Sequence, residues 1–188
     1  YYAEVARAYL DRYGASPEDF ARVAVKNRAN AILNPLAQMH KPQSVEDVLA
    51  ARMIVPPLTL PMCSPITDGA AALVICSEEK ARALGLPLVV VRACQNASGA
   101  DGQPVADATA RACAVAGLGA ADCDVLELHD AAAPAELLQY QEIGLCAEGD
   151  GFRLLRDGAT GPQGAHPVNM SGGLLSRGHA VGATGCAQ

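Results

Sequence analysis

The chain has 188 residues, of which 51% are hydrophobic and 18% charged, enough for a packed core and unlike a disordered segment. Its net charge is −6 and its 14 Lys and Arg residues are scattered, which argues against nucleic acid as a partner. No apolar run has the length of a membrane span, no signal-peptide pattern opens the sequence, and the seven cysteines form no CxxC pair. We therefore expect reduced thiols and a cytoplasmic location.

The first 62 residues are predicted to form a helical lobe. Residues 1–10 read as helix from the start, without an initiating Met or an N-cap. The sequence SPED at 16–19 is typical of a helix N-terminus, and the helix that it starts is expected to end before Asn34-Pro35. A second capping pattern, SVED at 44–47, opens a short helix. Four prolines in 53–65 then predict an extended connection.

Strand and helix patterns alternate from residue 63 onward, which predicts a layered α/β domain over 63–188. Continuous apolar runs predict strands that are covered on both faces, and these lie at 70–76, 88–93 and 123–128. Helical patterns separated by glycines lie at 77–85, 104–116 and 132–143. The glycine-rich segment 145–168 is predicted to form loops with a short hairpin. The final residues, 182–188, read as the start of a helix, so we expect the chain to be an interior piece of a longer protein.

Two histidines stand in positions that favour chemistry. His179 lies within 171–185, where five of fifteen residues are glycine, and His129 follows the apolar stretch 125–128. Glycine lets the backbone approach a ligand closely, and an imidazole exchanges a proton near neutral pH. This pairing suggests acyl transfer, but neither histidine has an obvious nucleophile beside it.

Several motifs together resemble the thiolase superfamily, in the branch of sterol-carrier-protein-type thiolases and lipid-transfer-protein-like acetyl-CoA acetyltransferases. The motifs agree in order and spacing: DGAAA at 68–72, LELHDA at 126–131, PAELL at 134–138, NMSGG at 169–173 and SRGH at 176–179. The resemblance covers nearly the whole chain. It implies a thiolase-type fold with a mixed sheet between helices, in which 1–62 belongs to the loop domain. The domain at 63–188 would then be truncated before its last strands.

The resemblance also implies a reaction and roles for both histidines. Such enzymes join or split acyl-CoA molecules by Claisen chemistry, through a thioester on a cysteine that would lie outside this chain. His179 matches the histidine that activates this cysteine and helps to hold an oxyanion. His129 matches a histidine that stabilises an enolate oxygen. The implied substrate is a coenzyme A thioester, with no metal or further cofactor. The implied partners are a second copy of the chain and a small OB-fold protein of the kind that some relatives have.

The chain departs from the pattern at four side chains. Ala131 stands where sterol-carrier-type thiolases have a cysteine that moves the α-proton, and Ala132 replaces an aromatic residue. Ala180 and Met170 each stand where the family usually has proline, which would fix the loop that aims His179. Because the nucleophile region and the last strands are also absent, we expect this piece alone to be inactive.

Other candidate residues have structural interpretations beside the functional ones. Asp130 can cap the helix that begins near residue 132, and Glu136 can be a first-turn acid or a catalytic carboxylate. Cys63 can be a nucleophile in a turn-rich loop, but packing is the favoured interpretation. His40 and His166 are predicted to be solvated loop residues.

The loop before His179 has its own structural interpretation. Asn169 and Ser171 are predicted to shape this loop through hydrogen bonds to the backbone. Gly172 and Gly173 are predicted to allow close packing. His129 or His179 can also be an ordinary core or surface group, so the catalytic interpretation is one of two.

Three functions remain open at this point. The first is a thiolase-like acyl-CoA acyltransferase, to which this chain supplies His129 and His179. The second is a retro-aldolase of lipid-transfer type that acts on β-hydroxyacyl-CoA. The third is a non-catalytic subunit that binds acyl-CoA or serves as a scaffold, and the alanines at 131, 132 and 180 keep it open.

Overall fold

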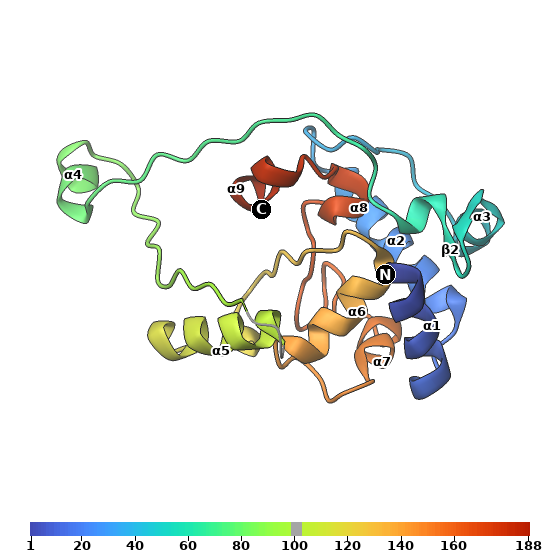
Figure 1. Ribbon diagram of the computed structural model, residues 1–188. Coiled ribbons are helices and arrows are strands. Elements are labelled where there is room, and N and C mark those ends of the chain that lie inside the picture. The colour runs from blue at the N-terminus through green and yellow to red at the C-terminus, as the bar shows by residue number, and fades with distance from the viewer. Residues whose placement is uncertain (99–102) are drawn as a thin grey trace.

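Three helices form the N-terminal part of the chain, as the capping patterns predict. The computed structural model describes residues 1–98 and 103–188. Its first helices are α1 (Tyr2–Tyr13), α2 (Pro17–Ala31) and α3 (Val45–Ala50) (Figure 1). Reciprocal capping boxes open α2 and α3, so local sequence explains where both begin. Helix α2 lies at the centre of the fold and packs against α3, α6, α7, α8 and η1.

A short hairpin follows α3 and leads into the second part of the chain. Strand β1 (Met53–Val55) pairs antiparallel with β2 (Leu58–Thr59), and the 3-10 helix η1 (Leu60–Met62) follows directly. The four prolines of this segment therefore allow a two-stranded turn within the connection that the sequence predicts to be extended. Met62 is fully buried and anchors the hairpin to the core.

The remaining elements are helices. They are α4 (Glu78–Ala83), α5 (Pro104–Ala116), η2 (Ala120–Asp122), α6 (Ala133–Glu142), α7 (Gly151–Arg156), α8 (Gly173–Arg177), η3 (Val181–Ala183) and α9 (Thr184–Ala187). Four of these eight described helices, α4, α5, α6 and α9, lie where the sequence predicts a helix. The prediction of loops and a hairpin over 145–168 is wrong, because α7 lies inside that segment. This helix forms because Phe152 and Leu155, three residues apart, bury the same face in the core.

The strands predicted in 63–188 are the main difference between sequence and structure. Residues 70–76 and 88–93 are extended but pair with none of the described residues, and Val74 and Val89 are 97% and 93% exposed. The segment 123–128 forms only a single parallel bridge, between Leu126 and Val168. A strand buried on both faces needs neighbouring strands and covering helices. The described residues supply neither for 70–76 and 88–93.

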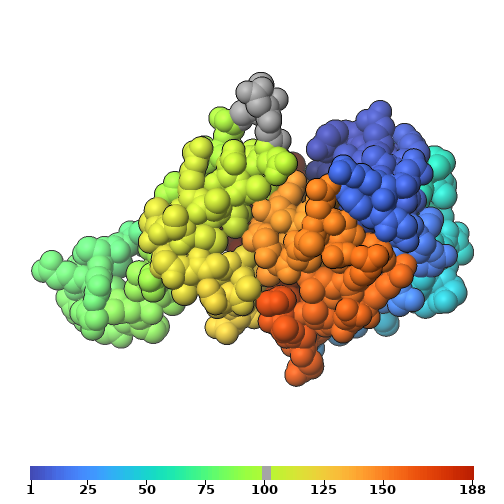
Figure 2. Space-filling view, turned by 90° about the horizontal axis from the view of Figure 1, so that it is seen from below, coloured from blue at the N-terminus to red at the C-terminus, as the bar shows by residue number. Residues whose placement is uncertain are grey.

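We call residues 68–98 the arm. Figure 1 shows the arm leaving the rest of the molecule as a long open loop, with α4 at its far end. Figure 2 shows the same green segment projecting from one end of the body. Almost every side chain of the arm is exposed, including those of Leu73, Ile75 and Val91.

The core lies among α1, α2, α3, α6, α7 and α8. Its largest fully buried side chains include Tyr9, Phe20, Met62, Leu137 and Tyr140. Helices from the two ends of the chain lie against each other here: α1 contacts α6, and α2 contacts α7 (Figure 2). Burial of each such side chain stabilises the fold by about 1.5–3 kcal/mol. The core is continuous across residue 62, and the division into 1–62 and 63–188 stays a prediction.

Candidate active site

The structure brings the two predicted site histidines together. The ring centroids of His129 and His179 are 4.9 Å apart, and the rings meet edge to face at 85°. His129 is exposed and His179 is half-buried, so solvent or a ligand can reach the pair. The residues come from segments 50 positions apart in the sequence, as their numbers show. Their proximity therefore depends on the tertiary fold.

A glutamine on α6 fixes the backbone of His129. The peptide N–H of His129 donates to Gln139 Oε1 at 2.9 Å, and its carbonyl accepts from Gln139 Nε2 at 2.8 Å. Gln139 is buried, so these bonds are shielded from water. The two bonds fix the backbone of His129 and so the direction in which its side chain projects.

Two threonines position His179. Its Nδ1 lies 2.8 Å from the hydroxyl of Thr184, the first residue of α9, and its backbone N–H donates to Thr67 Oγ1 at 3.2 Å. A parallel backbone bridge also joins His179 to Ile66. Because Nδ1 is engaged, Nε2 is the ring nitrogen left for chemistry, and no described residue forms a hydrogen bond to it.

A buried polar cluster adjoins His129 in sequence through Asp130. Its centre is Asn27, whose single amide nitrogen donates to Asp130 Oδ2 and to Glu136 Oε2, both at 2.7 Å. Asn169 donates a further bond to Glu136 Oε2 at 2.7 Å. Lys26 Nζ lies 3.0 Å from Glu136 Oε1, which also accepts from the Tyr140 hydroxyl.

Asp130 connects both histidines to this cluster. The prediction that Asp130 caps the helix near residue 132 is wrong: the N-cap of α6 is Ala132, which makes no side-chain bond. Asp130 instead accepts from the backbone N–H groups of Leu174 at 2.7 Å and Leu175 at 3.4 Å, in the first turn of α8. Helix N-termini present unpaired N–H groups, so this carboxylate satisfies them. It follows His129 in sequence and holds the helix that leads to His179.

Burial sets the electrostatics of the site. It raises the pKa of Asp130 well above its usual value, and the charge of Glu136 raises it further. Burial and Glu136 also raise the pKa of Tyr140, so its hydroxyl stays a proton donor. The pKa of His129 is lowered, first by partial burial and second by the neighbouring His179. A neutral imidazole at position 129 is therefore favoured near pH 7.

In the loop before His179, the glycines and Asn169 behave as the sequence predicts, whereas the Ser171 side chain bonds to a carboxylate and not to the backbone. Gly172 and Gly173 have φ values of 102° and 58°, and a Cβ on Gly173 would run into the Asp130 carboxylate. Asn169, with φ 55°, accepts from the backbone N–H of Leu128 at 2.7 Å. The backbone and hydroxyl of Ser171 both donate to Glu127.

Among the described residues, none of the remaining candidates forms a hydrogen bond with either histidine. Cys63 is half-buried, and burial raises the pKa of its thiol, which disfavours the thiolate that a nucleophile needs. His40 is exposed, as predicted for a loop. His166 differs from its prediction, because it is half-buried and its Nδ1 has no partner among the described residues.

Sequence reasoning missed the polar residues of α2. Lys26 and Asn27 lie in the middle of the helix, and Asn27 is fully buried together with Phe20 and Val23. These three positions follow the i, i+3, i+7 spacing of one helix face. The polar Asn27 on the apolar face of α2 was therefore the feature of the sequence that could have indicated a buried polar cluster. Within 1–98 and 103–188, no group of three or more His, Cys, Asp or Glu side chains is arranged to hold a metal ion.

Comparison with known proteins identifies the family of this chain. Residues 92–188 match the family described as thiolase C-terminal domain-like. The chain belongs to this thiolase family. It is 40% identical over its full length to the benzoylsuccinyl-CoA thiolase subunit BbsB of Thauera aromatica, of which it covers 51%. It is also 40% identical to an acetyl-CoA acetyltransferase of Methanothermobacter thermautotrophicus, again covering 51% of that protein.

A solved SCP2-thiolase like protein of Mycobacterium smegmatis confirms the thiolase-type fold: it superposes on 99% of this chain with a TM-score of 0.68 at 23% identity, and the match covers 43% of that protein's chain. The Ltp2-ChsH2(DUF35) aldolase superposes on 98% of this chain with a TM-score of 0.85 at 31% identity, and the match covers 52% of that protein's chain. This thiolase-family chain thus spans about half the length of the curated relatives cited above. In the described part of the chain, no helix is long and apolar enough to cross a membrane.

Proposed function

We propose that this thiolase-family chain supplies His129 and His179 to an acyl-CoA acyltransferase site whose nucleophilic cysteine lies outside it. The observation that carries the proposal is the edge-to-face contact of the two rings, with centroids 4.9 Å apart. The similarity to a thiolase subunit and an acetyltransferase supports the same reaction class. In this proposal the chain alone does not turn over.

His179 is the proposed activator of the cysteine. Its Nδ1 is engaged with Thr184, which leaves Nε2 to take the proton of a thiol. A thiol is only slightly ionised at neutral pH, so a neighbouring imidazole increases the thiolate fraction. The thiolate then adds to the carbonyl carbon of a β-ketoacyl-CoA, and the electron pair moves to the carbonyl oxygen.

His129 is the proposed stabiliser of the enolate. When the carbonyl re-forms, the bond between the α- and β-carbons breaks and its electrons pass to the thioester oxygen of the leaving acetyl-CoA. A neutral His129 can donate an N–H to that oxygen, and a donor of this kind contributes about 2.7–4 kcal/mol. The lowered pKa of His129 supports the neutral state.

The α-proton needs another group in this proposal. The enolate carbon must gain a proton in thiolysis and lose one in condensation. Ala131 and Ala132 follow the His129 segment and carry no acidic atom. We therefore assign this proton to a group outside residues 131 and 132. The substrate is a coenzyme A thioester, and the proposal uses no metal or redox cofactor.

Acylation of the longer protein tests the proposal. After incubation with acetyl-CoA, mass spectrometry of peptic peptides should find the acetyl thioester on a cysteine outside these residues. His179→Ala should abolish it, whereas His166→Ala, a matched variant away from the pair, should retain it. Acetylation of Cys63, or unchanged acetylation of the His179 variant, would contradict the assignment.

A retro-aldolase is the second candidate, because the aldolase cited above superposes at 31% identity. A cleavage assay with matched β-keto and β-hydroxy acyl-CoA substrates separates the two functions. Preferential cleavage of the hydroxy compound would favour the aldolase. The name of that neighbour joins Ltp2 to ChsH2(DUF35), which supports a proposed partner protein, such as an OB-fold protein, beside self-association of this chain.

A further inference from the structure

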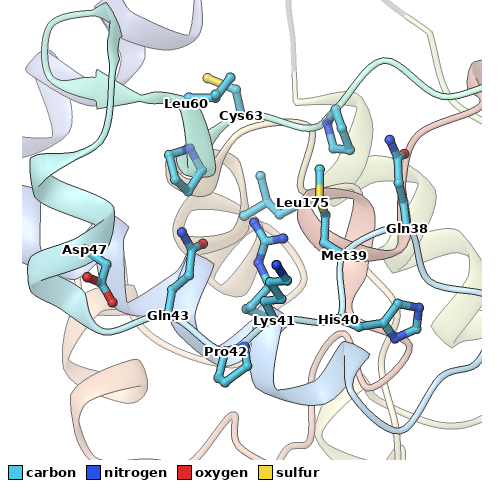
Figure 3. A pocket seen from close by; sticks show the side chains of 13 residues that line it. Gln38, Met39, His40, Lys41, Pro42, Gln43, Asp47, Leu60, Cys63 and Leu175 are labelled. Atoms are coloured by element: carbon cyan, nitrogen blue, oxygen red, sulfur yellow. The ribbon is translucent and has the colours of Figure 1, made fainter.

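A cavity of about 790 Å³ lies between α2, the segment that follows it, and the connection after η1. Figure 3 shows Met39, Gln43 and Leu175 around its central space. Most of its lining surface is apolar, and Leu60 and Pro61 belong to it. A volume of this size is in the range of small-molecule sites.

One wall of the cavity is formed by the connection after η1, which bridges to the segments that carry the histidine pair. Cys63 lines the cavity, and its backbone bridges to Ala132, three residues after His129. Pro65 also lines it, next to Ile66, whose backbone bridges to His179. Residues 63–66 therefore link the cavity to the backbone of both histidine segments, although neither histidine lines the cavity and His129 lines a separate pocket.

A buried, unpaired arginine points to the kind of ligand. Arg28 lines the cavity, is only 8% exposed, and makes no side-chain hydrogen bond or ion pair with the described residues. Its Nε is fully buried without a partner. An unpaired charge in such a place is costly, and burial lowers the pKa of Arg28. An anion would supply the missing partner.

The other charged groups do not supply it. Lys41 and Asp47 both line the cavity but are exposed, and their opposite charges balance. The Asp47 carboxylate already accepts from the backbone N–H of Ser44 at 2.9 Å. The ring of His40 points away from the central space (Figure 3). Arg28 is thus the one buried charge among the described lining residues, and a single carboxylate would balance it.

We propose that this cavity binds a carboxylate on the acyl group of the substrate, with the Arg28 guanidinium as its partner. The proposal rests on the acyl-CoA function above and names the substrate class: acyl groups that end in a carboxylate. The apolar walls would contact the methylene stem, and the guanidinium fork would take both carboxylate oxygens. Gln43 also lines the cavity, and its side-chain NH2 is a donor suited to a carboxylate oxygen.

Calorimetry with two matched, non-hydrolysable ligands tests the proposal. S-(3-carboxypropyl)-CoA carries a carboxylate, and S-butyl-CoA has the same stem without it. We expect the wild-type chain to bind the carboxylate ligand about tenfold more tightly, the effect of one charge-assisted contact. Arg28→Met should remove this preference. Arg22→Met, which removes an exposed arginine on the same helix, should retain it.

Each result has a distinct meaning. Equal binding of the two ligands by the wild type would overturn the carboxylate site and leave the acyl-CoA function intact. If Arg28→Met weakens free CoA as much as the carboxylate ligand, Arg28 pairs with a phosphate of the carrier and the proposal is wrong. Absence of any binding to CoA compounds would count against the acyl-CoA function itself.

A ligand without CoA keeps the site testable in that last case. Pentanoate should shift the ¹⁵N–¹H resonance of Arg28 Nε in a saturable way, whereas the neutral analogue pentanamide should not. A shift with pentanoate alone would support the anion site even if the acyl-CoA function fails. No shift, or the same shift with both compounds, would overturn it. Arg28→Met is expected to fold, because it replaces an unpaired buried charge with an apolar side chain of similar length.

Discussion

The core and the arm have similarly apolar sequences but opposite environments. In the core, Val23 and Leu137 are fully buried against several helices. In the arm, Val74 and Val89 come from equally apolar runs and are almost fully exposed. The difference shows that an apolar pattern is buried only where a second surface exists to cover it. The described residues provide that surface to the helices of the core and not to the apolar runs of the arm.

The largest expected effect comes from the polar centre of the core. Asn27→Leu removes the one amide nitrogen that bonds both Asp130 and Glu136. Two buried carboxylates then lose a shared donor, and we expect the free energy of unfolding to fall by about 3–5 kcal/mol. Urea denaturation followed by circular dichroism measures this change. Asn96→Leu, the same substitution at an exposed arm position, should stay within about 0.5 kcal/mol. Equal effects would contradict the comparison.

A matched pair of leucines tests the apolar side of the same contrast. Leu137→Ala should leave a cavity beneath α6 and lower the free energy of unfolding by about 2–5 kcal/mol. Leu73 is 70% exposed, so Leu73→Ala should change it by less than about 0.5 kcal/mol. The same denaturation experiment compares both variants. A large loss for Leu73→Ala would mean that the arm is covered in solution.

The helices could be predicted because their signals are local. The capping boxes at Ser16 and Ser44 and the glycine after α5 mark boundaries within one or two residues of those observed. Local sequence does not decide whether 70–76 and 88–93 form strands, because a strand needs hydrogen-bonding partners from other parts of the chain. The apolar composition of these two runs predicts strands, but neither run forms one, because the described residues offer them no partner strand.

The site shows the same division between local and distant information. The glycine-rich run and the apolar stretch marked His179 and His129, and the fold brings them into contact. Their catalytic roles stay predictions. Asn27 was missed because its partners, Asp130 and Glu136, lie 103 and 109 residues away. Asp130 was assigned to the nearest helix, but its carboxylate caps α8, more than forty positions later.

Two glycines separate backbone strain from close contact. Gly173 and Gly85 have similar φ values, 58° and 65°, which cost an L-residue about 1–2 kcal/mol. Only at Gly173 would an added Cβ meet another side chain, that of Asp130; at Gly85 nothing lies within 4 Å. We expect Gly173→Ala to lower the free energy of unfolding by about 2–3 kcal/mol and Gly85→Ala by about 1 kcal/mol or less. Thermal denaturation of the two variants measures the difference, and equal losses in the free energy of unfolding would show that Asp130 moves aside.

The smallest effect is the change in the pKa of His129 when its neighbour is removed. NMR titration of the imidazole protons, assigned with His129→Asn, should give a pKa below the usual 6.5. In His179→Ala the pKa should rise but stay below 6.5, because burial is the larger cause and the neighbouring histidine the smaller one. The arm contains no histidine, so every imidazole signal reports on the rest of the chain.

The same titration has a consequence for stability. A lowered pKa means that the folded chain binds fewer protons at His129 than the unfolded chain does. Its contribution to stability is therefore present above pH 6.5 and is lost as the pH falls from 6.5 toward the folded pKa. The wild type should lose more stability between pH 8 and pH 5 than His129→Asn, as measured by urea denaturation at both pH values. An identical loss in the two proteins would mean that His129 titrates as it does in the unfolded chain, and the contact with His179 would then have no electrostatic effect.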